Sequence, residues 1–158
     1  MGDCPENPIR DSSYDEVMDQ FGWLYRAEKL PASLVLKARW FISEAASAAI
    51  VRVNPDVVRL KGMVVLPEWR GCGYGEAMLL HMMRAGVASG YTTGEAFTHP
   101  VAPRTPTAGP RWFLERGWVE VRRTKHGMGV YRGDLLTTLD SDIAAGVDDH
   151  SVQDGITD

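Results

Sequence analysis

Residues 62–85 constrain the fold most, because they combine a strand, a glycine-rich turn and a helix with no linker between them. Residues 63–66 form an apolar run that ends at Pro67, which cannot donate a hydrogen bond to a sheet. Glycines follow at positions 71, 73 and 75, where the backbone can adopt conformations that a Cβ forbids. Apolar residues then recur at helical spacing, which predicts a helix over 74–88.

This turn predicts an anion-binding site. The first N–H groups of a helix have no partner inside the helix, and the helix dipole adds a partial positive charge there. The three glycines let a ligand approach the main chain closely, and Arg70 adds a mobile cation just before them. Phosphate is the ligand that such a turn favours, and several nucleotide-binding folds use the same physics.

The order of residues 65–75, VLPEWRGCGYG, resembles the signature of the GNAT superfamily, the acyl-CoA-dependent N-acyltransferases. That signature is Arg/Gln-x-x-Gly-x-Gly/Ala after a strand that ends in Val-x-Pro, and Arg70, Gly73 and Gly75 fill it here. Residues 112–118, WFLERGW, are similar to the Tyr/Phe-x-x-x-Gly-Phe/Trp run that closes the fourth helix of that fold. The two segments together indicate the family more strongly than either does alone.

The resemblance implies a mixed α/β (α+β) fold, with a central, mostly antiparallel sheet, one splayed parallel pair of strands and flanking helices. It implies acetyl-CoA as the co-substrate and an amine as the acceptor. The pantetheine arm would enter between the splayed strands and bond main-chain groups of Met63 and Val65. The implied cofactor-binding residues are Met63, Val65, Arg70, Gly71, Cys72, Gly73, Tyr74, Gly75, Glu76 and Phe113.

The remaining pattern predicts one domain over residues 13–139, between a frayed leader at 1–12 and an acidic, disordered tail at 140–158 that carries six aspartates and no Lys or Arg. A helix is expected from Ser12 or Ser13 to about residue 29. Short connections then favour an antiparallel meander of strands at 34–43, 48–53 and 57–66, although residues 45–49 could instead be helical. The later expected elements are a strand at 91–98 parallel to one before it, a proline-rich loop at 99–110, a helix at 111–116, and a hairpin of 118–123 with 128–135.

Composition excludes several classes of protein. No apolar run approaches the roughly 18–20 residues that a membrane helix needs, and the N-terminus has neither the basic start nor the apolar segment of a secretory signal. Cys4 and Cys72 stand in the leader and the turn, so we expect no disulfide between them, and a reducing cytoplasm is the simplest location. The histidines are scattered along the chain, so no structural metal is expected.

Acyl transfer needs a base for the amine and an acid for the leaving thiolate. The family commonly supplies the acid as a Tyr four residues before the Gly of the closing segment, where this chain has Phe113, and the matching Asn about seven residues earlier is replaced by Pro106. Glu95 and His99 share one face of the fifth expected strand and are candidate bases, unless both simply face solvent. Tyr131 is the candidate acid, or else a packed core tyrosine.

Three alternatives stay open. A dinucleotide-binding domain fits less well, because Glu76 occupies the position of its third glycine and no crossover helices separate the strands before the motif. A GNAT-like domain that binds an acyl-CoA without catalysis, as a sensor or scaffold, is favoured by Phe113. A transferase that acts on a nucleobase or nucleic acid is favoured by the basic segment 104–132, and a homodimer is also open.

Overall fold

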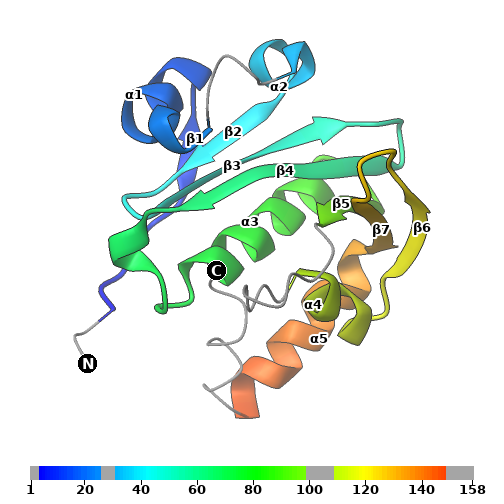
Figure 1. The fold of residues 1–158 in the computed structure, drawn as a ribbon. Coiled ribbons are helices and arrows are strands. Elements are labelled where there is room, and N and C mark those ends of the chain that lie inside the picture. Colours follow the sequence, from blue (N-terminus) through cyan, green and yellow to red (C-terminus); the bar gives the residue numbers. More distant parts are fainter. Residues whose placement is uncertain (1–3, 26–30, 99–108, 149–158) are drawn as a thin grey trace.

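A seven-stranded sheet with helices on both faces organises the computed structural model, which describes residues 4–25, 31–98 and 109–148 (Figure 1). The strands are β1 (Arg10–Ser12), β2 (Arg39–Ile42), β3 (Ala46–Arg52), β4 (Val57–Val65), β5 (Thr93–Thr98), β6 (Val119–Arg123) and β7 (Gly129–Asp134). The helices are α1 (Tyr14–Tyr25), α2 (Ala32–Leu36), a short 3-10 turn η2 (Pro67–Trp69), α3 (Tyr74–Ala88), α4 (Gly109–Glu115) and α5 (Leu135–Asp148). Helices α1 and α2 lie on one face of the sheet, and α3, α4 and α5 lie on the other (Figure 1).

The strand order is β1-β2-β3-β4-β5-β7-β6, and every neighbouring pair is antiparallel except β4 with β5. The parallel pair follows from the crossover through α3, because a strand entered from a helix crossover returns in the same direction. Its register runs from Val57 opposite Thr93 to Leu60 opposite Ala96, and there it stops although β4 continues to Val65. The expected fold class, with one parallel pair that separates, is confirmed.

Two hydrophobic cores flank the sheet. Alternate residues of β4, Val58 and Leu60, pack with the methionines of α3 in the larger core. On the other face, Val17 and Phe21 of α1 pack against Trp40 and its neighbours. Arg59 and Lys61, which alternate with Val58 and Leu60 along β4, therefore face the α1 side of the sheet. Within the described ranges, no helix has both the length and the apolar character to cross a membrane.

The N-terminal part differs from expectation at residues 10–12 and 32–36. Residues 10–12 form β1 and pair with β2, whereas we expected them in a frayed leader. Ser13 caps α1 as one of the two expected caps, since its hydroxyl accepts a hydrogen bond from the Glu16 N–H at 3.1 Å. The strand expected from residue 34 was wrong at its start, because 32–36 are helical, and the alanine-rich run 46–49 is strand and not helix.

The C-terminal part also differs. Helix α4 starts at Gly109, two residues before the expected start, and Gly117 follows it with φ of 85° as the expected stop signal. The expected hairpin is present as β6 and β7. Residues 140–148 belong to α5, so the expectation of a disordered tail was wrong for them. Of the loop expected at 99–110, residues 99–108 lie outside the described residues and 109–110 belong to α4.

Candidate functional site

The connection from β4 to α3 has the geometry of an anion-binding turn. Gly71 and Gly73 have φ of 87° and 79°, in the left-handed region that residues with a Cβ disfavour. Gly73 is the N-cap of α3 and has no side chain to bond the helix start, so no N-cap side chain competes with a ligand for the N–H groups of Tyr74 and Gly75. A Cβ placed on Gly71 would meet no described heavy atom within 4 Å, and Arg70 beside it is exposed. The turn therefore combines main-chain donors, a helix dipole and a mobile cation.

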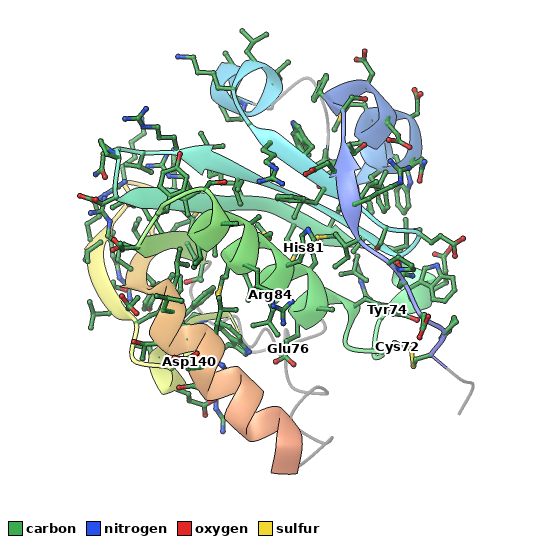
Figure 2. All side chains as sticks on the ribbon, turned by 180° about the vertical axis from the view of Figure 1, so that it is seen from behind. Cys72, Tyr74, Glu76, His81, Arg84 and Asp140 are labelled. Atoms are coloured by element: carbon green, nitrogen blue, oxygen red, sulfur yellow. A yellow bond between two sulfur atoms is a disulfide. The ribbon has the colours of Figure 1, made fainter. Side chains whose placement is uncertain are left out.

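Cys72, in the middle of this turn, forms a disulfide with Cys4. Our expectation of no disulfide was therefore wrong. The two Cα atoms are 5.6 Å apart, although 68 positions separate the residues in sequence, and the Tyr74 hydroxyl donates to the carbonyl oxygen of Pro5 beside the bridge. Figure 2 shows Cys72 and Tyr74 where the N-terminal segment crosses the start of α3. The bridge ties residues 4–9 to the anion-binding turn.

Glu76, in the first turn of α3, connects this helix to α4. Its carboxylate is buried and accepts a hydrogen bond of 3.2 Å from the indole N–H of Trp112, while Arg116 approaches it to 3.8 Å. The Arg116 guanidinium also lies over the Trp112 ring, 3.9 Å from its centroid. These contacts occupy the carboxylate and hold the closing segment 112–118 against the helix that begins at the turn.

The part of β4 beyond its pairing with β5 contains a bulge. Ala49 pairs with Lys61 and Ser47 pairs with Val64, so β4 has one residue more than β3 between these two pairs. Gly62, which lies in this bulge, has φ of 63°. The Tyr25 hydroxyl of α1 donates to the Gly62 carbonyl oxygen, which fixes the orientation of this peptide. Met63 follows it and is 40% exposed, and Val65 ends the strand. This segment is where the resemblance places main-chain contacts to a pantetheine arm.

Glu95 is fully buried in β5 and is held by two arginines. Arg59 of β4 donates through Nε at 2.6 Å, and Arg132 of β7 donates through Nε at 2.9 Å. Burial alone would raise the pKa of Glu95, but the hydrogen bonds from Arg59 and then Arg132 outweigh burial, so the pKa is lower than its usual value. Glu95 therefore does not face solvent, and its contacts make it a weaker proton acceptor than a free carboxylate.

Tyr131 lies in the larger core, stacked on Phe113 at a centroid distance of 6.5 Å. Its hydroxyl is 3.3 Å from a carboxylate oxygen of Glu120 and donates to it. Burial, and then the negative charge of Glu120, raise the pKa of Tyr131 above its usual value. The phenol therefore stays protonated through neutral pH, which suits a proton donor.

The structure brings together only part of the predicted site. Turn residues 70–76 and segment 112–118 lie side by side through Glu76, and Tyr131 stacks on Phe113. His99 and Pro106 lie outside the described residues. His81 of α3 is half-buried, with its ring 4.9 Å from that of Phe41.

Sequence reasoning missed the side chains that surround Glu95, namely Arg59, Lys61, Phe97 and Arg132. A signal was present, because Arg59 and Lys61 alternate along one expected strand and Glu95 and Phe97 along the next, so each pair lies on one face. Among the described residues, no group of three His, Cys, Asp or Glu side chains is placed to hold a metal ion.

Comparisons with known proteins indicate one family of acetyltransferases. A model of the acetyltransferase (GNAT) family matches residues 3–105. No match is found among curated proteins. The fold is similar to that of an IAA acetyltransferase from Bacillus cereus, with a TM-score of 0.66 and 12% identity over 82% of this chain and 99% of the other.

Two further solved structures share the fold. One is the ribosomal-protein-S18-alanine N-acetyltransferase from Escherichia coli, with a TM-score of 0.62 and 18% identity over 82% of this chain and 94% of the other. The other is a Bacillus subtilis acetyltransferase in complex with CoA, with a TM-score of 0.60 and 13% identity over 82% of this chain and 99% of the other. At these identities the structural likeness concerns the fold alone.

Proposed function

We propose that this chain, which belongs to the GNAT family of acetyltransferases, transfers an acetyl group from acetyl-CoA to an amine. The observation that carries the proposal is the turn at the start of α3, where Gly71 and Gly73 have positive φ and the helix begins without a side-chain cap. Such a turn suits the diphosphate of CoA, and it follows the part of β4 that has separated from β5.

The donor would be bound by the residues that the family signature implies. Main-chain N–H groups of 71–76 would bind the diphosphate and Arg70 would add a charge-assisted bond, since it is exposed beside the turn. Main-chain groups of Met63 and Val65 would bond the pantetheine amides. Phe113 would line the thioester end, because it is buried beside Tyr131. The Bacillus subtilis neighbour crystallised with CoA agrees with acetyl-CoA as the co-substrate.

The transfer forms an N–C bond between the amine and the acetyl carbonyl carbon and breaks the C–S bond of the thioester. The amine loses a proton to a base, and the leaving thiolate takes one from an acid. We assign the acid to Tyr131, whose pKa is raised by burial and by Glu120. Of the two candidate bases we favour His99, directly or through a water, because the carboxylate of Glu95 is occupied by Arg59 and Arg132.

A thiol-release assay with acetyl-CoA and a panel of small amines, peptides and nucleic acids tests this function. Amine-dependent release of free CoA, with the acetyl group recovered on the amine by mass spectrometry, is the expected result. Calorimetry of acetyl-CoA binding is the parallel measurement. Saturable binding without turnover of any acceptor would contradict the transferase and favour the alternative of an acyl-CoA sensor, which the phenylalanine at position 113 already favours.

The cytoplasm remains the proposed location, but for a different reason. The expectation rested on unpaired cysteines, and the bridge between Cys4 and Cys72 removes that support. The donor is now the basis, because acetyl-CoA is an intracellular metabolite. Fractionation of the producing cells, with alkylation of free thiols before lysis, measures both the location and the state of the two cysteines there.

A further inference from the structure

Four cationic side chains gather where β4 and β5 separate, on the sheet face opposite α3. Arg59, Glu95 and Arg132 are register partners across β4, β5 and β7, so they form one row on this face. Phe97, Val130 and Arg122 form the next row across β5, β7 and β6. Lys61 and Phe97 each directly follow the last pair of the parallel ladder, Leu60 with Ala96. We call Arg59, Lys61, Arg122 and Arg132 the cation cluster.

One aromatic ring contacts three of these cations. The Arg59 guanidinium lies 5.0 Å, the Lys61 ammonium 4.8 Å and the Arg122 guanidinium 5.5 Å from the centroid of Phe97. A ring attracts a cation through its quadrupole, but that attraction does not remove the repulsion between three cations around it. The arrangement therefore concentrates positive charge around the end of the parallel ladder.

Within the described residues, carboxylates offset only part of the charge of the cluster. Across residues 4–25, 31–98 and 109–148, Glu95 is the one carboxylate paired with these four cations. The Arg59 and Arg132 side chains are only 27% and 37% exposed, so solvent screens them incompletely. Burial, and then the charge of Arg59, lower the pKa of Lys61 below its usual value, which indicates that another anion would be favourable there.

We propose that the cation cluster binds an anionic group of the acceptor, so that the acceptor is a small amine that also carries a carboxylate or a phosphate. This rests on the proposed function and names the acceptor class for the same site. Arg59 uses Nε for Glu95, and within the described part of the chain its terminal nitrogens make no side-chain hydrogen bond. A planar anion can therefore bond that guanidinium while Lys61 supplies a second charge.

Glu95 acts in this site as a positioning residue. Its two oxygens receive Arg59 and Arg132 from opposite neighbouring strands, which fixes both guanidiniums relative to the end of the ladder. Because the thioester is expected in the gap between β4 and β5, an anion on the cluster would leave the amine of a short molecule near the thioester. Arginines that only faced solvent would not require a buried carboxylate to fix their positions.

The test measures acceptor binding separately from turnover. Calorimetry on the full chain saturated with CoA compares two matched pairs that differ only in the anion, β-alanine with β-alaninamide and O-phosphoethanolamine with ethanolamine. We expect the anionic member of at least one pair to bind about tenfold or more tightly than its neutral partner, with affinity falling as salt rises. The pair that responds tells whether the anion is a carboxylate or a phosphate.

Three variants locate the effect. Lys61→Met and Arg122→Gln remove cluster charges without leaving Glu95 unpaired, and Arg59→Gln combined with Glu95→Gln removes a pair as a unit. Each should weaken binding of the anionic amine about tenfold and leave the neutral amine unchanged. Arg52→Gln is the control, because Arg52 is exposed at the far end of β3 opposite Val58.

Several results would overturn the inference. The inference is wrong if anionic and neutral amines bind with equal affinity. It is also wrong if all three variants still bind the anion. Both conclusions hold even if thiol release shows that the chain is a transferase. Salt-dependent binding of a short single-stranded RNA or DNA that these variants abolish would also overturn the inference, since the cluster would then serve a polynucleotide. Anion-selective binding without thiol release from any acceptor would leave the cluster assigned and would contradict the transferase function alone.

Discussion

The rings of Tyr131 and Phe113 lie nearly parallel, with 6.5 Å between their centroids and 17° between their planes. Phe113 occupies the position where the family signature commonly has the acidic Tyr, and β7 places a phenol directly against it from another part of the chain. The hydroxyl that Phe113 lacks is thus present on the neighbouring ring of Tyr131. Its pKa is raised by burial and then by Glu120, so it carries a proton at neutral pH.

Tyr131→Phe should therefore lower kcat strongly. A single acid commonly contributes about 10²–10⁴-fold, and the loss should lie in this range while the affinity for acetyl-CoA changes by less than about twofold. The pKa of Tyr131 is raised in the folded protein, and the phenol keeps its proton at pH values below that pKa. The kcat of the wild type should therefore fall only at pH values above the usual pKa range of tyrosine. Steady-state rates across pH, with calorimetry of acetyl-CoA, provide the measurement.

Phe113→Tyr in the Tyr131→Phe background is the matched rescue. It adds a hydroxyl on the neighbouring ring, and partial recovery of kcat would show that the phenol and not the packing was lost. If Tyr131→Phe alone turns over at the wild-type rate, Tyr131 is a core residue and the acid lies elsewhere.

Gly73→Val should abolish the affinity for CoA. The φ of 79° at Gly73 is unfavourable for a residue with a Cβ, and a branched side chain would also obstruct the approach of a diphosphate to the main chain. Titration calorimetry with free CoA measures the loss.

Gly90→Val separates strain from occlusion. Gly90 has φ of 96° after the C-terminus of α3, and a Cβ there meets nothing within 4 Å, so this variant carries similar backbone strain away from the turn. We expect both variants to lose about 1–2 kcal/mol of folding free energy, but only Gly73→Val to lose CoA binding. Equal CoA affinities of the two variants would mean that the turn does not hold the diphosphate.

The sequence was sufficient for the turn and its two flanking elements, because these are specified locally. Pro67 ends the strand, the glycines permit the turn, and the apolar period of residues 74–88 specifies α3. The antiparallel meander of β2, β3 and β4 and the final hairpin of β6 and β7 followed from the short connections between these strands. The residues that needed no distant partner were thus predictable.

What sequence reasoning missed depends on distant partners. β1 has only three residues and no apolar alternation, so it is defined by pairing with β2 and by the bridge from Cys4 to Cys72. We did not predict α5, because the acidic composition of the tail indicated disorder. Asp134 caps this helix by accepting a hydrogen bond of 2.8 Å from the Thr137 N–H, and Leu135 and Leu139 are buried on one of its faces. The surroundings of Glu95 required the register of three strands.

Glu95→Gln should destabilise the fold more than it affects the donor site. Neutralising a buried carboxylate that holds two partly exposed arginines should cost about 1–3 kcal/mol of unfolding free energy, while CoA affinity stays unchanged. The folded pKa of Glu95 is lowered, so its stabilisation is present above the unfolded pKa, near 4.3, and is lost as pH falls through the folded pKa. The wild type should therefore lose more stability than the variant on acidification, as urea unfolding at several pH values would show.

Glu115→Gln is the control for this variant. Glu115 pairs with Arg111 on the surface, where the side chains are 55% and 81% exposed, so its loss should cost less than about 0.5 kcal/mol. If Glu95→Gln retains stability but loses about 10²-fold or more in kcat, Glu95 is the general base after all.

Breaking the bridge between Cys4 and Cys72 should lower stability and loosen the anion-binding turn. The bridge joins residues that are 68 positions apart in sequence. Such bridges typically add about 2–4 kcal/mol to the free energy of unfolding, which corresponds to about 4–16 °C in Tm for a chain of this length. Because Cys72 lies between Gly71 and Gly73, Cys4→Ser should also weaken CoA binding. Thermal unfolding and calorimetry with and without reductant measure both effects, and the variant should not respond to reductant. An equal response of the two proteins would show that the bridge does not form in solution, and unchanged CoA affinity in the variant would show that the turn keeps its shape without residues 4–9.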